Sequence, residues 1–194
     1  MKLFQPNELK LLWTFYLDAL ISPMLYFVPV FFVLYFKELN FTLTQISILM
    51  AVAPLFSLIF EVPTGAFADL YGRKASVLLS FFLAAIGYGL LTFFTNFFTL
   101  LFIFAFIGFA HTFASGAKEA WVVDLLRKQK GLFANYTAKM QAFDAFGLVV
   151  SGIVGAIFVK AFGLIILWPI TALCFLISLI ILFFAPEKKV KKDR

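Results

Sequence analysis

Ionisable side chains inside long apolar stretches are the groups in this sequence that are best placed to do chemistry. The candidates are Asp18, Glu61, His111, Lys118, Glu119 and Asp144. Even on lenient scales such a group costs roughly 2.5–3.5 kcal/mol in lipid, so it normally faces a bundle interior or a water-filled cavity. We therefore predict that these residues line a polar path for a small solute. Because desolvation favours the neutral form of a carboxyl group, one carboxylate is expected to exchange a proton.

The spacing of polar residues supports this prediction. Thr14, Asp18 and Ser22 recur every four residues and therefore share one face of a helix. Two further polar stripes follow helical spacing: Gln141, Asp144 and Ser151, and His111, Ser115 and Lys118 with Glu119 beside them. At about 100° per residue, Asp124 points roughly 120–140° away from the last stripe, which suits a separate role.

The alternative interpretation is that these charges are structural. Lys118 would then form an ion pair with Glu61 or Glu119, and for these three residues this interpretation is favoured. His111 would be a hydrogen-bonded residue of the bundle rather than a ligand. For Asp18 and Asp144 both interpretations stay open, because a charge retained in lipid is explained either by a partner or by a water-filled cavity.

The composition shows what kind of chain must position these groups. Hydrophobic residues make up 63% of the 194 residues and charged residues only 13%, against roughly 45–50% and about 25% in a soluble domain. With a mean hydropathy of +1.03, a disordered chain and an ordinary soluble enzyme are excluded. The single Cys and single His exclude an intramolecular disulfide framework and argue against a Cys- or His-rich metal centre. We predict an integral membrane protein with no metal and no cofactor.

Stretches of about 20 apolar residues, enough to cross the hydrocarbon core, recur along the chain. They cover residues 11–36, 44–67, 75–94, 97–124, 137–161 and 163–185. The connections are short, which makes successive helices antiparallel neighbours. The predicted fold is all-α: residues 1–194 form a single bundle of six transmembrane helices, and residues 186–194 form a basic tail.

The distribution of cations predicts the orientation in the bilayer. Arg73, Lys74 and the basic segments 127–130 and 188–194 all fall on one side, whereas Lys37 and Lys160 fall on the other. Because cytoplasmic loops carry an excess of Lys and Arg, both termini are expected in the cytoplasm, with the protein in the cell (inner or plasma) membrane. The net charge of +6 is thereby explained without nucleic acid as a partner.

A short charged motif follows the second span. It consists of Gly65, Asp69, Gly72, Arg73 and Lys74 at fixed spacing. A small residue such as Gly65 lets another helix approach closely, and Gly72 permits a sharp reversal. Asp69 lies near a helix C-terminus, where the helix dipole is already negative, so the carboxylate needs a cation or the positive end of another helix.

This motif resembles the element that joins the second and third spans in the major facilitator superfamily, and residues 115–124 resemble a bacterial subgroup of it. The resemblance implies that Asp69 and Arg73 form a charge cluster with Asp124. It further implies secondary transport of a small solute by alternating access, through rocking of two six-helix halves. The intramembrane carboxylates, rather than the resemblance, predict H⁺ as the coupling ion. This chain corresponds to the first of the two halves. The resemblance therefore implies a partner, which is either another copy of the chain or a missing C-terminal half. The chain would accordingly be a natural half-transporter, a fragment or the product of a truncated gene. The resemblance also implies that Asp69 meets a helix of that second half.

Small residues in the fifth span indicate close helix packing. Gly147, Ser151 and Gly155 recur every four residues, a small-residue face of the kind that lets helix backbones approach in membranes. Cys174, in the apolar sixth span, is expected to be an inert packing residue.

Two functions outside transport remain as alternatives. A non-transporting membrane scaffold would need no charged residues around a cavity. An intramembrane serine protease is suggested by Ser115 followed by Gly116, but Phe113 stands where that motif needs glycine. The only His, His111, lies four residues away on the same helix, so the sequence offers no conventional dyad. We expect no enzymatic activity.

Overall fold

The fold is a bundle of helices, seen in a computed structural model that describes residues 8–126 and 132–187. The elements are α1 (Glu8–Leu25), α2 (Val28–Glu38), α3 (Leu43–Tyr71), α4 (Arg73–Leu90), α5 (Phe97–Thr112), α6 (Ala117–Leu126), α7 (Leu132–Phe162), a 3-10 turn (Leu164–Ile166) and α8 (Leu167–Phe183). No strand occurs among these described residues. Within the described part of the chain, six helical segments are long and apolar enough to cross a membrane. The prediction of an all-α bundle with six transmembrane helices is confirmed.

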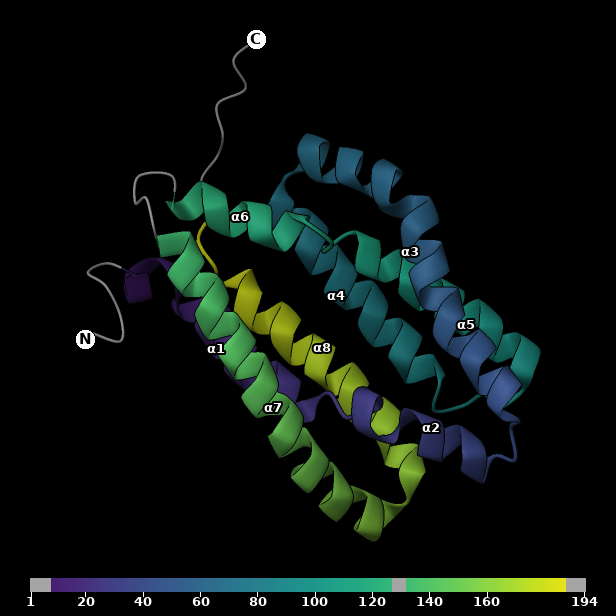
Figure 1. Ribbon diagram of the computed structural model, residues 1–194. Helices are drawn as coiled ribbons and strands as arrows, with labels where there is room; N and C mark the ends of the chain where they lie inside the picture. The colour runs from purple at the N-terminus through teal and green to yellow at the C-terminus, as the bar shows by residue number, and fades with distance from the viewer. Residues whose placement is uncertain (1–7, 127–131, 188–194) are drawn as a thin grey trace.

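Two of the spans are each built from two helices with a break between them. The first span breaks between α1 and α2, with Pro23 in the last turn of α1 and Pro29 in the first turn of α2. Proline has no backbone N–H to donate, so it weakens the helical ladder at this point. The fourth span breaks between α5 and α6, where Gly116 has a φ of +67°, a conformation that glycine adopts readily. Figure 1 shows α6 running in a different direction from α5.

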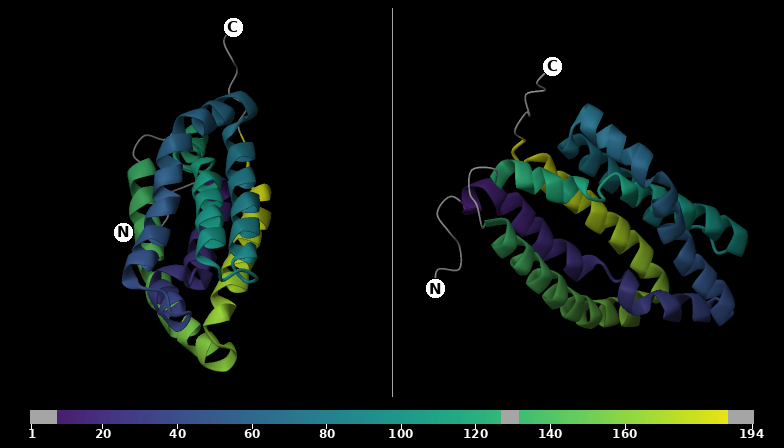
Figure 2. Two further views of the ribbon diagram at one scale, coloured as in Figure 1. Left: turned by 90° about the vertical axis from the view of Figure 1, so that its right-hand side faces the viewer. Right: turned by 45° about the horizontal axis from the view of Figure 1, so that its top comes forward.

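The packing of the helices brings spans far apart in sequence side by side. Along the bundle, α1 packs on α7 and α8, α4 packs between α5 and α8, and α3 packs on α5 (Figures 1 and 2). One apolar core surrounds Trp168, whose ring centre lies 5.0 Å from that of Tyr35. A second core surrounds Trp121, whose ring centre lies 4.9 Å from that of Phe15. These two cores fix the positions of α1, α6 and α8 around the middle of the bundle.

The small-residue face of α7 packs closely against a neighbouring helix, as predicted, and the structure shows that this neighbour is the first span. A Cβ atom added to Gly147 would lie 2.2 Å from the Cβ of Pro23, and one added to Gly155 would lie 2.5 Å from the ring of Phe31. Ser151, between the two glycines, is fully buried. Side chains at these positions would therefore push α7 away from α1 and α2.

Gly65 does not make the close approach that the sequence suggested. A Cβ added at Gly65 would have no described atom within 4 Å, because this face of α3 is not covered by another described helix. Gly72 does act as predicted: it has a φ of +103° and forms the single-residue junction between α3 and α4. The chain can reverse direction there because glycine has no Cβ to clash in this conformation.

Candidate functional site

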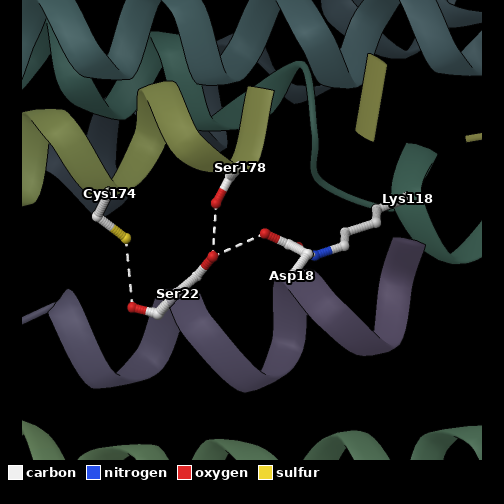
Figure 3. Close-up of polar contacts among 5 residues, drawn as sticks. All are labelled: Asp18, Ser22, Lys118, Cys174 and Ser178. Carbon is white, nitrogen blue, oxygen red and sulfur yellow. Dashed lines mark hydrogen bonds and ion pairs between the residues drawn. The ribbon is translucent and has the colours of Figure 1, made fainter. Parts of the chain in front are cut away.

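An ion pair inside the bundle joins the first span to the fourth. Lys118 Nζ lies 2.7 Å from Asp18 Oδ2, although the two residues are 100 positions apart in the chain. The Asp18 side chain is only 3% exposed and that of Lys118 is 27% exposed. Figure 3 shows Lys118 reaching from α6 toward the carboxylate on α1.

The partner of Lys118 is therefore different from the one expected from the sequence. Glu119 follows Lys118 directly on α6, so its side chain points about 100° away around the helix. Glu61 is exposed and accepts a hydrogen bond from Ser115 Oγ at 3.4 Å. Asp18 lies on a helix that faces Lys118 across the bundle, which puts it within reach.

Hydrogen bonds extend this ion pair to the sixth span. Ser22 Oγ donates to Asp18 Oδ1 at 2.7 Å and lies 2.5 Å from Ser178 Oγ (Figure 3). One turn along α8, Cys174 Sγ donates to the backbone carbonyl of Ser22 at 3.2 Å. Both oxygens of Asp18 are thus satisfied, and Cys174, expected to be an inert packing residue, is part of this polar cluster.

Two adjoining cavities border the ion pair, with volumes of about 210 Å³ and about 420 Å³. Both are lined by Asp18, Ser22, Pro23, Lys118 and Asp144. Glu119 lines only the smaller cavity, whereas Cys174 and Ser178 line the larger one. The structure thus brings four of the predicted path residues, Asp18, Lys118, Glu119 and Asp144, to one site. Asp144 has no hydrogen bond or ion pair to any residue in the described part of the chain.

The other two predicted path residues, Glu61 and His111, do not line these cavities. His111 Nε2 lies 3.4 Å from the hydroxyl of Tyr88, which in turn lies 3.1 Å from that of Tyr26. This geometry agrees with the interpretation of His111 as a hydrogen-bonded bundle residue. It also leaves Ser115 without a histidine partner, since its hydroxyl donates to Glu61 instead.

A second charged cluster lies where α3 meets α4. The guanidinium of Arg73 forms an ion pair with Asp124, which is buried on α6, and also donates to the carbonyl of Ala120 at 2.5 Å. Lys74 Nζ donates to the carbonyls of Phe183 and Ala185, both at 2.8 Å. The motif therefore ties the ends of α4, α6 and α8 together.

The sequence of this chain matches a known protein family over almost its whole length. A sequence profile described as "Major Facilitator Superfamily" matches residues 15–194. The chain belongs to the Major Facilitator Superfamily. An uncharacterized MFS-type transporter of Bacillus subtilis (strain 168), YxaM, is 31% identical over 90 residues, covering 46% of this chain and 23% of that protein. The match thus spans about a quarter of that relative, and no solved structure matches the chain.

Membership of the Major Facilitator Superfamily makes this a multi-pass membrane protein of a transporter family. The pairing of Arg73 with Asp124 is the contact that the resemblance implied. Asp69, by contrast, is exposed in the last turn of α3 and forms no ion pair or hydrogen bond with another described residue. Within this superfamily member, the charge cluster therefore contains Arg73 and Asp124 without Asp69.

Several polar residues of the bundle were missed by the sequence reasoning. Glu8 is fully buried and accepts hydrogen bonds from Lys139 Nζ, at 2.5 Å, and from the hydroxyl of Tyr16. Glu8 precedes the first apolar stretch, which begins at residue 11 in the sequence, so the hydropathy pattern does not predict its burial. Ser178 was missed as well, although its four-residue spacing from Cys174 marks one polar face of the sixth span. The basic segments 127–130 and 188–194 lie outside the described residues.

Proposed function

We propose that this protein acts in secondary active transport of a small solute by alternating access, coupled to the movement of protons. The observation that carries this proposal is the ion pair between Asp18 and Lys118, which bridges two spans beside a cavity of about 420 Å³. Cavities of this size between helices are the usual form of a small-molecule site. A scaffold would have no need of such a charged and hollow centre.

The ion pair is better explained by transport than by stability. Replacing a buried ion pair with apolar residues of similar volume is often neutral or stabilising, so its retention is weak evidence for a structural role. A pair that joins two spans can separate when a solute or a proton takes the place of one partner. Protonation of Asp18 would release Lys118 and loosen the link between α1 and α6, which is a direct way to couple proton binding to helix movement.

The motion would be rocking of this six-helix domain against a second one, either another copy of the chain or a C-terminal half. In this superfamily the transport path lies between two such halves. The spans Leu43–Tyr71 and Leu132–Phe162 are the least buried of the six. Only 11% and 17% of the residues in their most apolar stretches are buried in the bundle. Gly65 and Asp69 lie on the open face of the first of these spans. We propose that this face receives the second half, where Asp69 finds its partner.

Arg73, Asp124 and Lys74 would stabilise one of the two states at the cytoplasmic face. Lys74 contacts the end of α8 and Lys139 contacts the start of α1, so these cations gather at one end of the bundle. The excess of cations at this end supports a cytoplasmic location for it in the plasma membrane, together with both termini.

Reconstituted proteoliposomes that contain a pH-sensitive dye test this proposal. A panel of small solutes is added, and solute-dependent proton flux is expected with at least one of them. Asp18→Asn and Asp144→Asn are expected to abolish the flux or uncouple it from solute uptake. Glu38→Gln, which removes an exposed carboxylate at the end of α2, is the matched control and is expected to behave as wild type.

Three results would contradict the proposal in different ways. Unchanged coupling in both aspartate variants would remove the proton-carrier role. Solute uptake without proton movement would leave transport standing and refute the coupling. Absence of uptake for every solute, with the protein correctly folded in the bilayer, would favour the scaffold.

A further inference from the structure

We propose that the cavity beside Asp144 binds a small organic cation, with the Asp144 carboxylate as its anchor and aromatic rings as its walls. This inference rests on the proposed transport function and names the class of solute that the site accepts. Three properties of the larger cavity support it. One charge in the lining has no ion pair with another described residue, the walls carry aromatic rings, and the lining suits neither a metal ion nor an anion.

Among the described residues that line the larger cavity, one carboxylate has no hydrogen bond or ion pair. Asp18 is neutralised by Lys118 at 2.7 Å, and its other oxygen accepts a hydrogen bond from Ser22. Asp144 lines both cavities and forms no hydrogen bond or ion pair with a described residue, although the Lys118 ammonium also attracts its carboxylate. Of the charged residues that line the larger cavity, Asp144 is therefore the one that is free to bind a ligand. The Asp144 side chain is exposed, so an incoming cation can reach its carboxylate without separating the helices of the bundle.

The walls of the larger cavity suit a cation that carries apolar groups. Tyr26, Phe81 and Phe175 line it, together with aliphatic and proline side chains. The face of an aromatic ring attracts ammonium groups. Lys118 already makes such a contact, with Nζ lying 5.7 Å from the centre of the Phe81 ring.

The aromatic walls are held in place by their neighbours. Phe175 stacks on Tyr88 with ring centres 5.2 Å apart and only 6° between the ring planes. It also meets Tyr26 edge to face, with ring centres 6.1 Å apart. The hydroxyls of Tyr26 and Tyr88 lie 3.1 Å apart. The rings are thus arranged before a ligand arrives, which reduces the entropy that binding would cost.

A metal ion fits the same site poorly. Hard cations such as calcium take six or more oxygen ligands, and no group of three or more His, Cys, Asp or Glu residues is arranged for a metal among the described residues. An anion would have to displace Asp18 from Lys118 and would also face Asp144. The site therefore favours an organic cation over both of these alternatives.

Equilibrium dialysis with protein in lipid nanodiscs tests the inference directly. The probe is radiolabelled benzyltrimethylammonium, with benzyl alcohol as its neutral analogue and phenylacetate as its anionic analogue. We expect saturable binding of the cation, which neither analogue displaces at the same concentration. Asp144→Asn is expected to weaken the binding at least about tenfold, equivalent to about 1.4 kcal/mol. Asp144→Glu keeps the charge and is expected to retain binding, and Glu38→Gln serves as the control for removal of a carboxylate elsewhere.

The outcomes separate this inference from the proposed function. Equal binding by Asp144→Asn and wild type, or displacement of the cation by phenylacetate, would overturn the cation site. If Asp144→Asn does not fold, Asp144→Glu and the competition between analogues in the wild type still decide. Coupled uptake of other solutes without any cation binding would refute the cation site and leave transport standing. Saturable binding that depends on Asp144, in a protein that moves no solute, would support the site and refute transport.

Discussion

Removal of Lys118 is expected to destabilise this bundle strongly. Lys118→Met keeps most of the side-chain volume but leaves the Asp18 carboxylate, 3% exposed, with a hydrogen bond from Ser22 and no counter-charge. Breaking a buried ion pair by removing one partner typically costs about 3–5 kcal/mol. Because the Lys118 side chain is 27% exposed, water reaches the pair from the cavity side, and we expect a loss near 3 kcal/mol in the free energy of unfolding.

The double variant separates an uncompensated charge from lost packing. Asp18→Asn combined with Lys118→Met removes both charges, so no buried ion is left without a partner. Its stability is expected to lie well above that of Lys118→Met alone, with a coupling energy of about 2–3 kcal/mol between the two sites. Asp18→Asn alone should cost less than Lys118→Met, because the remaining ammonium can turn toward the cavity.

Unfolding by SDS in mixed micelles, followed by tryptophan fluorescence, measures these differences. Lys160→Met, which removes an exposed lysine on α7, is the matched control and is expected to change stability by less than about 0.5 kcal/mol. A Lys118→Met protein as stable as this control would refute the reasoning. So would a double variant whose loss equals the sum of the two single losses.

Two further predictions concern helix packing and the charged motif. Gly147→Ala should destabilise the protein by about 1–3 kcal/mol, because the added Cβ would lie 2.2 Å from that of Pro23. Gly152→Ala lies on the same helix, where an added Cβ would have no atom of the described residues within 4 Å. It should be neutral or gain up to about 1 kcal/mol in the same unfolding assay. Equal losses at the two glycines would contradict the close packing of α7. Arg73→Lys keeps the positive charge and should change the free energy of unfolding by less than about 1 kcal/mol. It should nevertheless slow solute flux, because an ammonium does not reproduce the paired N–H donors of a guanidinium. A wild-type flux would argue against a role of the Arg73–Asp124 pair in the transport cycle.

Features that depend on one helix alone, such as its length and the residues that share one of its faces, were predicted best from the sequence. Apolar runs of about 20 residues predict membrane-spanning helices. In lipid every backbone N–H and C=O needs a hydrogen-bond partner within the protein, which only helices and closed barrels provide. Residue spacing likewise predicted the small face of α7 that carries Gly147 and Gly155. The ion pair between Arg73 and Asp124 came from resemblance to a family and not from spacing alone.

The sequence was least informative about which helices face one another. The spacing of Asp18 and Ser22 shows that they share a face of α1, but nothing local shows that Lys118, 100 residues away, lies opposite. The break at Gly116 turns α6 relative to α5, so a stripe drawn along one continuous helix misjudges the surroundings of Lys118. Tertiary packing also determines the site of Glu8, which lies outside the apolar stretch predicted for the first span yet is fully buried.

Exposure of the cavity to each side of the membrane in turn is the central claim, and sided labelling tests it most directly. Leu148, one turn from Asp144, lines the larger cavity, so Leu148→Cys in a Cys174→Ser background places the chain's single cysteine there. A membrane-impermeant thiol reagent is added to either side of oriented vesicles, with and without solute and a pH gradient. We expect reaction from both sides, with rates that change in opposite directions when solute and gradient are applied. Reaction from the same side alone under every condition would contradict alternating access through this cavity.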